Sequence, residues 1–243
     1  MDITRNEGWI GTKKILVILA HPDDPEFFCG ATIARWVDLG HEVDYLLLTT
    51  GQRGSPNPAD SLAMVAARRK AEQLRAAALL GVNDVQFLDY LDGDLVPDLA
   101  LRQEVVTRIR LLKPDIVVSC DPQNQFPAHG RINHPDHRAA GQVVVDAVFP
   151  AAGNPSYLIA GNTAGINNPH QVEEVWLALT SQPNTALVLT DYLDRKLSAI
   201  IAHQSQIHVP QEELRAMHLS RFEQIPQSSE PEYLEKFLRI KFI

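Results

Sequence analysis

Short apolar runs alternate along the chain with longer segments of helical pattern, and this alternation predicts the fold. Residues 14–19 (KILVIL) are apolar after their first lysine, as expected of a strand buried on both faces. Residues 31–39 have a helical pattern that ends before Gly40, and residues 43–48 form a second apolar run. The N-terminal part of the chain is therefore predicted to be a strand–helix–strand unit.

The same alternation continues to about residue 206. Further helices are expected over 60–80, 99–112 and 191–206 with another ending at 148, and further strands over 85–88, 115–120, 172–179 and 186–189. Alternating strands and helices form a mainly parallel, doubly wound sheet with helices on both faces. We therefore expect an α/β, Rossmann-like fold in which the strands, numbered along the chain, lie in the order 3-2-1-4-5, with extra strands beyond.

The chain of 243 residues carries no internal repeat, low-complexity tract or linker that would divide it. At this length one α/β domain can bury a large core. We expect a single domain over 1–243, with a core over about 14–206 and a C-terminal extension over about 207–243. The last residues, EYLEKFLRIKFI, are amphipathic and are expected to pack on the body of the protein or on a neighbouring subunit.

Histidines and carboxylates are concentrated where such a fold places its ligands. In the expected order the first and fourth strands are neighbours and their connections diverge, and ligands bind beyond the carboxyl ends of the strands at such a point. The sequence at the end of the first strand reads AHPDDPE (20–26), and downstream of the fourth strand it reads HPDH (134–137). Both motifs are therefore predicted to meet in one pocket.

These side chains match the ligands that a borderline divalent cation prefers, imidazole nitrogen and carboxylate oxygen. His21, Asp24 and His137 would make a three-ligand set that leaves a coordination position open for water, as in a catalytic zinc site. Asp23, next to a ligand, could then accept a proton from the metal-bound water. Taken alone, the aspartates could cap a helix and HPDH could form a proline turn, but their joint position favours a metal site.

The two motifs, with GATIARW after the first, resemble those of the zinc-dependent de-N-acetylases related to N-acetylglucosaminyl-phosphatidylinositol deacetylase, the LmbE-like (PIG-L) family. The resemblance covers roughly 14–206. It includes TTGQRG after the second strand, Arg69-x-x-Glu72, the Asp92-Gly93 turn and AIIAHQSQ near the end. His203 in that last segment stays outside the predicted site. The resemblance implies a zinc-dependent N-deacetylase with a Rossmann-like fold, in agreement with the strand pattern.

The resemblance also implies roles at the metal. His21, Asp24 and His137 match the family's metal ligands, and Asp23 matches its general base. Zn²⁺ is the expected metal, with another divalent metal such as Fe²⁺ as the alternative.

Four further residues receive roles from the resemblance. His134 matches the histidine that polarises the amide carbonyl or protonates the leaving amine, and Asp136 matches the carboxylate that orients and charges that histidine. Arg69 and Asp92 match positions that contact the sugar in relatives. Some relatives also carry a tyrosine shortly before HPDH that helps to hold the oxyanion, whereas residues 131–133 here are RIN.

The expected activity is removal of an acetyl group from an N-acetylglucosamine-type sugar, or from a related N-acyl substrate, by a metal-bound water. Two alternatives remain. Two histidines and one carboxylate also form the facial triad of non-haem iron enzymes, although the adjacent Asp23 suits hydrolysis better. A catalytically silent nucleotide-binding domain would need a Gly-rich loop after the first strand, where this chain has the acidic HPDDPE.

Charge and composition narrow the partners. With 22 basic and 30 acidic residues the net charge is −8, which disfavours nucleic-acid binding. We find neither a long apolar run nor the apolar core of a secretory signal, so we expect a cytoplasmic protein without a membrane span. The expected partner is a small N-acetylated sugar or glycoconjugate. The family resemblance implies a homo-oligomer, often a hexamer.

Overall fold

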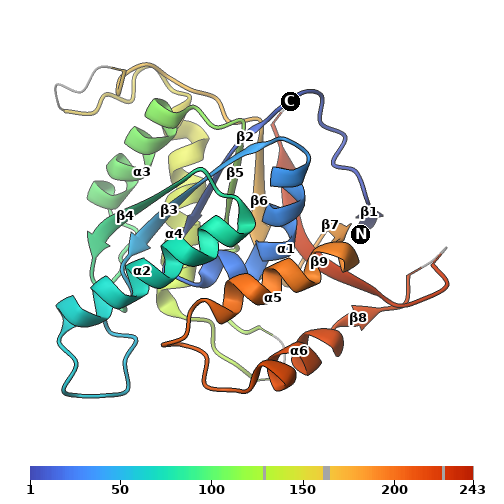
Figure 1. Ribbon diagram of the computed structural model, residues 1–243. Coiled ribbons are helices and arrows are strands. Elements are labelled where there is room, and N and C mark those ends of the chain that lie inside the picture. The colour runs from blue at the N-terminus through green and yellow to red at the C-terminus, as the bar shows by residue number, and fades with distance from the viewer. Residues whose placement is uncertain (128–129, 161–164, 226–227, 243) are drawn as a thin grey trace.

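Nine strands form one central sheet in the computed structural model, which describes residues 1–127, 130–160, 165–225 and 228–242 (Figure 1). The strands are β1 (Asp2–Thr4), β2 (Lys14–Leu19), β3 (Glu42–Thr49), β4 (Asp84–Tyr90), β5 (Ile116–Cys120), β6 (Glu174–Ala178), β7 (Thr185–Val188), β8 (Phe222–Glu223) and β9 (Glu232–Lys241). The path of the sheet runs β1-β7-β9-β6-β5-β2-β3-β4, and β8 pairs with β9. Within it, β4-β3-β2-β5-β6 are parallel neighbours, so the predicted order 3-2-1-4-5 is confirmed.

Helices cover both faces of this sheet (Figure 1). They are α1 (Asp24–Asp38), α2 (Leu62–Leu80), α3 (Leu99–Leu112), α4 (Pro135–Asp146), α5 (Leu193–Ile201) and α6 (Gln211–Leu219), with short helical turns at η1 (Ala147–Ala152) and η2 (Thr190–Tyr192). Alternate residues of β2 divide between two cores. Ile15 and Val17 pack with α1, α2 and α5, whereas Leu16 and Ile18 pack with α3 and α4. This two-sided burial explains the unbroken apolar run.

The first helix differs from the prediction, because α1 begins at Asp24 instead of at residue 31. Pro25 lies in its first turn, where a missing N–H costs nothing, and Asp24 and Glu26 place carboxylates at the positive end of the helix dipole. The second half of the first acidic motif is therefore helical. As a result, Asp24 is held by the first turn of a helix.

The C-terminal residues contribute a strand to the sheet. β9 lies between β6 and β7 and pairs antiparallel with both. Its Phe237 is fully buried and packs edge-on against Trp176 of β6, with ring centroids 5.3 Å apart. The amphipathic end of the chain therefore packs within the body of the protein. No helix among the described residues is long and apolar enough to cross a membrane.

The sheet brings the two acidic motifs together. β2 and β5 are adjacent, and their carboxyl ends lead into α1 on one face of the sheet and α4 on the other. The loops after β3 and β4 end at the same edge. The predicted meeting point of the two motifs is therefore confirmed, and four loops surround it.

Candidate active site

Helices α1 and α4 both begin at the acidic motifs, so the side chains of their first turns face one another. The i, i+3 spacing of His21 and Asp24 forms a turn, in which the Asp24 N–H donates to the His21 carbonyl at 3.3 Å. In return, the His21 N–H donates to Asp24 Oδ2 at 2.9 Å. The carboxylate is thereby fixed before any ligand arrives.

The Asp24 carboxylate lies between two imidazole rings. Its Oδ2 is 3.4 Å from His21 Nδ1, and its Oδ1 is 3.1 Å from His137 Nε2. The side chains of His21 and Asp24 are buried, and that of His137 is partly exposed. The structure thus brings together the three residues that the sequence predicts as metal ligands.

The outer nitrogen of each ring contacts a hydrogen-bond acceptor. His21 Nε2 is 3.1 Å from Asp136 Oδ2 and 3.2 Å from Asp92 Oδ1. His137 Nδ1 is 3.0 Å from Asn133 Oδ1. The outer N–H of each ring donates to these acceptors, so the inner nitrogens of His21 and His137 both face the Asp24 carboxylate and would coordinate a metal ion bound there. Two nitrogens and one carboxylate with this orientation fit a divalent cation such as Zn²⁺.

The charges around His21 favour a cation. Burial alone would lower the pKa of His21, but hydrogen bonds to Asp136, Asp24 and Asp92 outweigh it and raise the pKa to about 12. Burial would raise the pKa of Asp24, but His137 and His21 hold it well below its usual range. Three carboxylates around one imidazole therefore create a negative site that a proton or a metal ion can neutralise.

Asp23 lies beside the cluster with its carboxylate paired to one cation. Oδ2 is 3.0 Å from Arg69 Nη2, and the side chain is 17% exposed. Burial raises the pKa of Asp23 to about 6, and the nearby Arg69 charge limits that rise. A carboxylate with a pKa close to neutrality suits a general base.

His134 is oriented differently from the prediction. The sequence predicts that the Asp136 carboxylate orients and charges this ring, but that carboxylate accepts from His21 Nε2 and from the N–H groups of Gly93 and Leu95. Asp136 instead reaches His134 through its backbone N–H, which donates to Nδ1 at 3.2 Å. Burial and the His21 charge lower the pKa of His134. The ring is therefore a neutral imidazole that carries its proton on Nε2.

Arg69 and Asp92, the predicted sugar contacts, line the cavity but direct their polar atoms at the protein. Arg69 is 4% exposed, and it donates to the carbonyls of Gly51 and Pro22 as well as to Asp23. A Cβ at Gly51 would lie 2.1 Å from Arg69 Nη1, so the glycine there makes room for the guanidinium. Sugar contact by Arg69 and Asp92 stays a prediction.

A cavity of about 460 Å³ opens over this cluster. It is lined by His21, Asp23, Asp24, Arg53, Gly54, Arg69, Asp92, Gly93, His134 and His137. Arg53 stands at the exposed rim, where it donates to Asp92 O and Asp94 Oδ2, both at 2.8 Å. The lining is polar and includes every residue of the predicted metal set, as expected of a site for a hydroxylated substrate.

Asn133 is a functional candidate that sequence analysis missed. It is 6% exposed, and its amide group both accepts from His137 and donates to the Asn124 carbonyl at 2.9 Å. The only sequence signal was its position four residues before His137, immediately ahead of the residue that caps α4.

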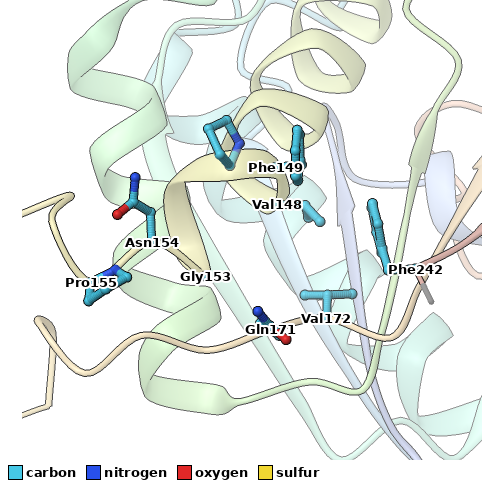
Figure 2. A pocket seen from close by; sticks show the side chains of 9 residues that line it. Val148, Phe149, Gly153, Asn154, Pro155, Gln171, Val172 and Phe242 are labelled. Carbon is cyan, nitrogen blue, oxygen red and sulfur yellow. The ribbon is translucent and has the colours of Figure 1, made fainter.

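A second cavity of about 450 Å³ lies beside η1 (Figure 2). Apolar, aromatic and amide side chains line it: Val148, Phe149, Pro150, Gly153, Asn154, Pro155, Gln171, Val172 and Phe242. Phe149 and Phe242 stack with centroids 6.3 Å apart. This lining offers no acid, base or metal ligand among the described residues, so we take the first cavity as the candidate site.

Comparisons with known proteins point to the same cavity. The family model described as PIG-L, GlcNAc-PI de-N-acetylase, matches residues 16–148, which include both acidic motifs. A diacetylchitobiose deacetylase of Thermococcus kodakarensis is 38% identical over 85% of this chain and 74% of its own length. A probable N-acetyl-alpha-D-glucosaminyl L-malate deacetylase 2 of Bacillus anthracis is 28% identical over 84% of this chain and 85% of its own length.

A solved structure agrees in fold as well as in sequence. The N,N'-diacetylchitobiose deacetylase of Pyrococcus horikoshii, solved with an inhibitor, superposes with a TM-score of 0.79 at 28% sequence identity. The match covers 94% of this chain and 84% of that one. The likeness therefore extends beyond the matched family region to the C-terminal strands.

Proposed function

The chain belongs to the PIG-L family, and from this premise we propose that it is a metal-dependent hydrolase that removes the acetyl group from an N-acetylglucosamine-type sugar or a related N-acyl substrate. The observation that carries the proposal is the arrangement at Asp24. Two imidazole nitrogens face its carboxylate, and a second carboxylate, Asp23, stands beside the cluster with a pKa near 6.

His21, Asp24 and His137 would hold the metal, and the proposed metal is Zn²⁺, with Fe²⁺ as the alternative. When bound, such an ion lowers the pKa of water from about 15.7 to roughly 7 and polarises the amide carbonyl. Asp136 and Asn133 would support the ligands by accepting the outer N–H groups of His21 and His137.

Asp23 would act as the general base. Hydrolysis adds water across the amide C–N bond and releases acetate and a free amine. Asp23 would take the proton from the attacking water and return it to the amine nitrogen when the C–N bond breaks. The Arg69 guanidinium keeps this carboxylate directed into the cavity, since it contacts Oδ2 at 3.0 Å.

His134 would stabilise the oxyanion. Its Nδ1 accepts the Asp136 N–H, so its Nε2–H is free to donate to the carbonyl oxygen as negative charge develops there. This role requires only a neutral imidazole. It also offers a replacement for the tyrosine that some relatives place before HPDH.

The substrate is proposed from the relatives and from the cavity. Relatives are named for N-acetylated glucosamine derivatives, with diacetylchitobiose and an L-malate glycoside among them. The polar cavity could seat one acetylated sugar, with Arg69 and Asp92 in its wall and Arg53 at its rim. Arg53 would then meet the part of the substrate beyond the reacting sugar.

A panel of N-acetylated sugars tests the proposal. Release of free amine is measured for diacetylchitobiose, N-acetylglucosaminyl malate and N-acetylglucosaminyl inositol, with zinc-loaded protein and with an Asp23→Asn control. We expect amine release from at least one sugar, and a loss of about 10²- to 10⁴-fold in the control. Absence of amine release from every sugar with fully metal-loaded protein would refute the proposed function.

A further inference from the structure

The backbone of Asp23 adopts a conformation that its side chain disfavours. Its φ is 90° and its ψ is −31°, in the region that only glycine enters readily. Such a conformation is unfavourable for a residue other than glycine and persists only where surrounding contacts enforce it. The conformation turns Asp23 away from its neighbour Asp24, so that one carboxylate faces the histidines and the other faces Arg69.

Three buried side chains, Gln73, Glu26 and His203, form a relay of hydrogen bonds that ends at the Asp23 backbone. The Asp23 N–H donates to Gln73 Oε1 at 2.8 Å, and Gln73 Nε2 donates to Glu26 Oε1 at 2.9 Å. Glu26 Oε2 is 3.0 Å from His203 Nε2. Gln73, Glu26 and His203 are each 0% exposed. The relay therefore joins α2, the first turn of α1 and the segment after α5.

The hydrogen bonds of the relay can run in only one direction from donor to acceptor. A carboxylate only accepts hydrogen bonds, so Glu26 obliges Gln73 to present its NH₂ group on that side and its carbonyl oxygen toward Asp23. Glu26 in turn is held by the His203 ring N–H. Each group thereby sets the orientation of the next one, and the final acceptor faces the backbone N–H of Asp23.

The geometry points to Gln73 and Glu26, anchored by His203, as positioning residues that hold the Asp23 backbone in its left-handed conformation. This inference rests on the proposed function of Asp23 as the base. Arg69 holds the carboxylate of Asp23, whereas the relay holds its main chain. The two contacts are complementary, because Arg69 pairs with the carboxylate of the base and Gln73 holds its backbone N–H.

Displacement of the base lowers the rate of the chemical step before it weakens substrate binding. A misplacement of about 1 Å can cost roughly 10²-fold in rate, since the reacting atoms leave their aligned approach. Gln73 is absent from the cavity lining and hydrogen-bonds none of the metal ligands. Loss of its contacts should therefore lower kcat while KM and the metal content stay close to wild type.

Gln73→Met is the diagnostic variant, because methionine is similar in size and removes both hydrogen bonds of the amide. We expect kcat to fall by about 30- to 100-fold, with KM within about threefold of wild type. We expect one metal ion per chain, as in the wild type, and a crystal structure of the variant in which the φ of Asp23 has left the positive region.

Two further variants separate positioning from general packing. In Glu26→Gln, the new amide oxygen can still accept from Gln73, and the new amide NH₂ can donate to His203 Nε2 if the His203 ring carries its proton on Nδ1. We therefore expect kcat to stay within about fivefold of wild type. Ser205→Ala is the matched control. It removes a 2.7 Å hydrogen bond to Glu72, beside Gln73 on the same helix, without touching the relay, so kcat should change by less than about twofold.

The outcomes separate the inference from the function on which it rests. A Gln73→Met enzyme with wild-type kcat and an unchanged Asp23 backbone would overturn the relay. Equal losses of kcat in Gln73→Met and Ser205→Ala would also overturn it, because general loosening would then explain both. A different pair of results would overturn the proposed function and leave the relay intact. In that case the wild-type protein is inactive on every sugar, but the φ of Asp23 has left the positive region in the Gln73→Met crystal structure.

Discussion

The proposed metal ligand Asp24 and the proposed base Asp23 are adjacent residues whose side chains point to opposite sides of the same turn. Asp24 meets His21 and His137, while Asp23 meets Arg69. Neighbouring carboxylates in one chain would repel each other if both faced the same point. Each here has its own cationic or hydrogen-bonding partner, which allows two negative charges to coexist in a buried site.

This separation predicts different failures for two substitutions. Asp23→Ala should keep the metal and lose about 10²- to 10⁴-fold in kcat, because only the base is removed. His137→Ala should lose the metal itself, since one of three ligands is gone. Metal analysis of both purified variants checks this, and a metal-free Asp23→Ala protein would contradict the assignment.

A further prediction concerns Asn133, which contacts the proposed ligand His137. Asn133→Leu removes the acceptor for His137 Nδ1–H, which frees the ring to rotate and to change tautomer. Such outer contacts typically contribute 10- to 100-fold in metal affinity, so we expect a loss of about that size. Competition with a chromophoric chelator measures the affinity. An unchanged dissociation constant would show that His137 is oriented without this amide.

At the scale of elements, α1 is joined to the C-terminal part of the chain at a break that follows its first turn. The helix is interrupted at Cys29, and a buried ion pair from two other elements fills the break. Lys196 of α5 donates to the Phe27 carbonyl, and Glu235 of β9 accepts from the Thr32 N–H at 2.8 Å. These contacts link the first turn of α1, which carries Asp24, to α5 and to the C-terminal strand β9.

The ion pair predicts a strong stability coupling. Lys196→Met should destabilise the protein by about 3–5 kcal/mol, because Glu235 would remain buried without its cation. The double variant Lys196→Met/Glu235→Leu should lose less than the sum of the single variants, since residues in contact are not additive. Urea unfolding measures all three variants. Strictly additive losses would show that the two charges stabilise the fold independently.

How well each strand could be predicted from the sequence depended on the pattern of its side chains. β2 and β5 were visible because strands buried on both faces are uninterrupted apolar runs. β9 was hidden because its charged and apolar residues, EYLEKFLRIK, do not alternate with the period of two that marks a strand. Its charged residues pair with distant partners instead, as Glu235 does with Lys196, Lys236 with Glu223, and Arg239 with Glu174. Pairings of that kind leave no local pattern, so the C-terminal strand could not be derived from its own sequence.

At the scale of the whole molecule, the parallel sheet gathers residues that are far apart in sequence. The convergence of the proposed metal ligands was predictable, because two compact motifs carry them and the strand order places both motifs at one edge. The supporting contacts were not predictable. His203 and Glu26 are separated by 177 residues and Gln73 and Asp23 by 50, and buried glutamines and asparagines resemble surface ones in a sequence.

We propose that His21, Asp24 and His137 hold a metal on which hydrolysis depends. The most direct measurement is amine release from the best N-acetylated sugar before chelation, after complete metal removal, and after stoichiometric add-back of Zn²⁺ or, anaerobically, Fe²⁺. We predict loss of activity on chelation and recovery on add-back, with no recovery in His137→Ala. Activity that survives complete removal of the metal would contradict the account.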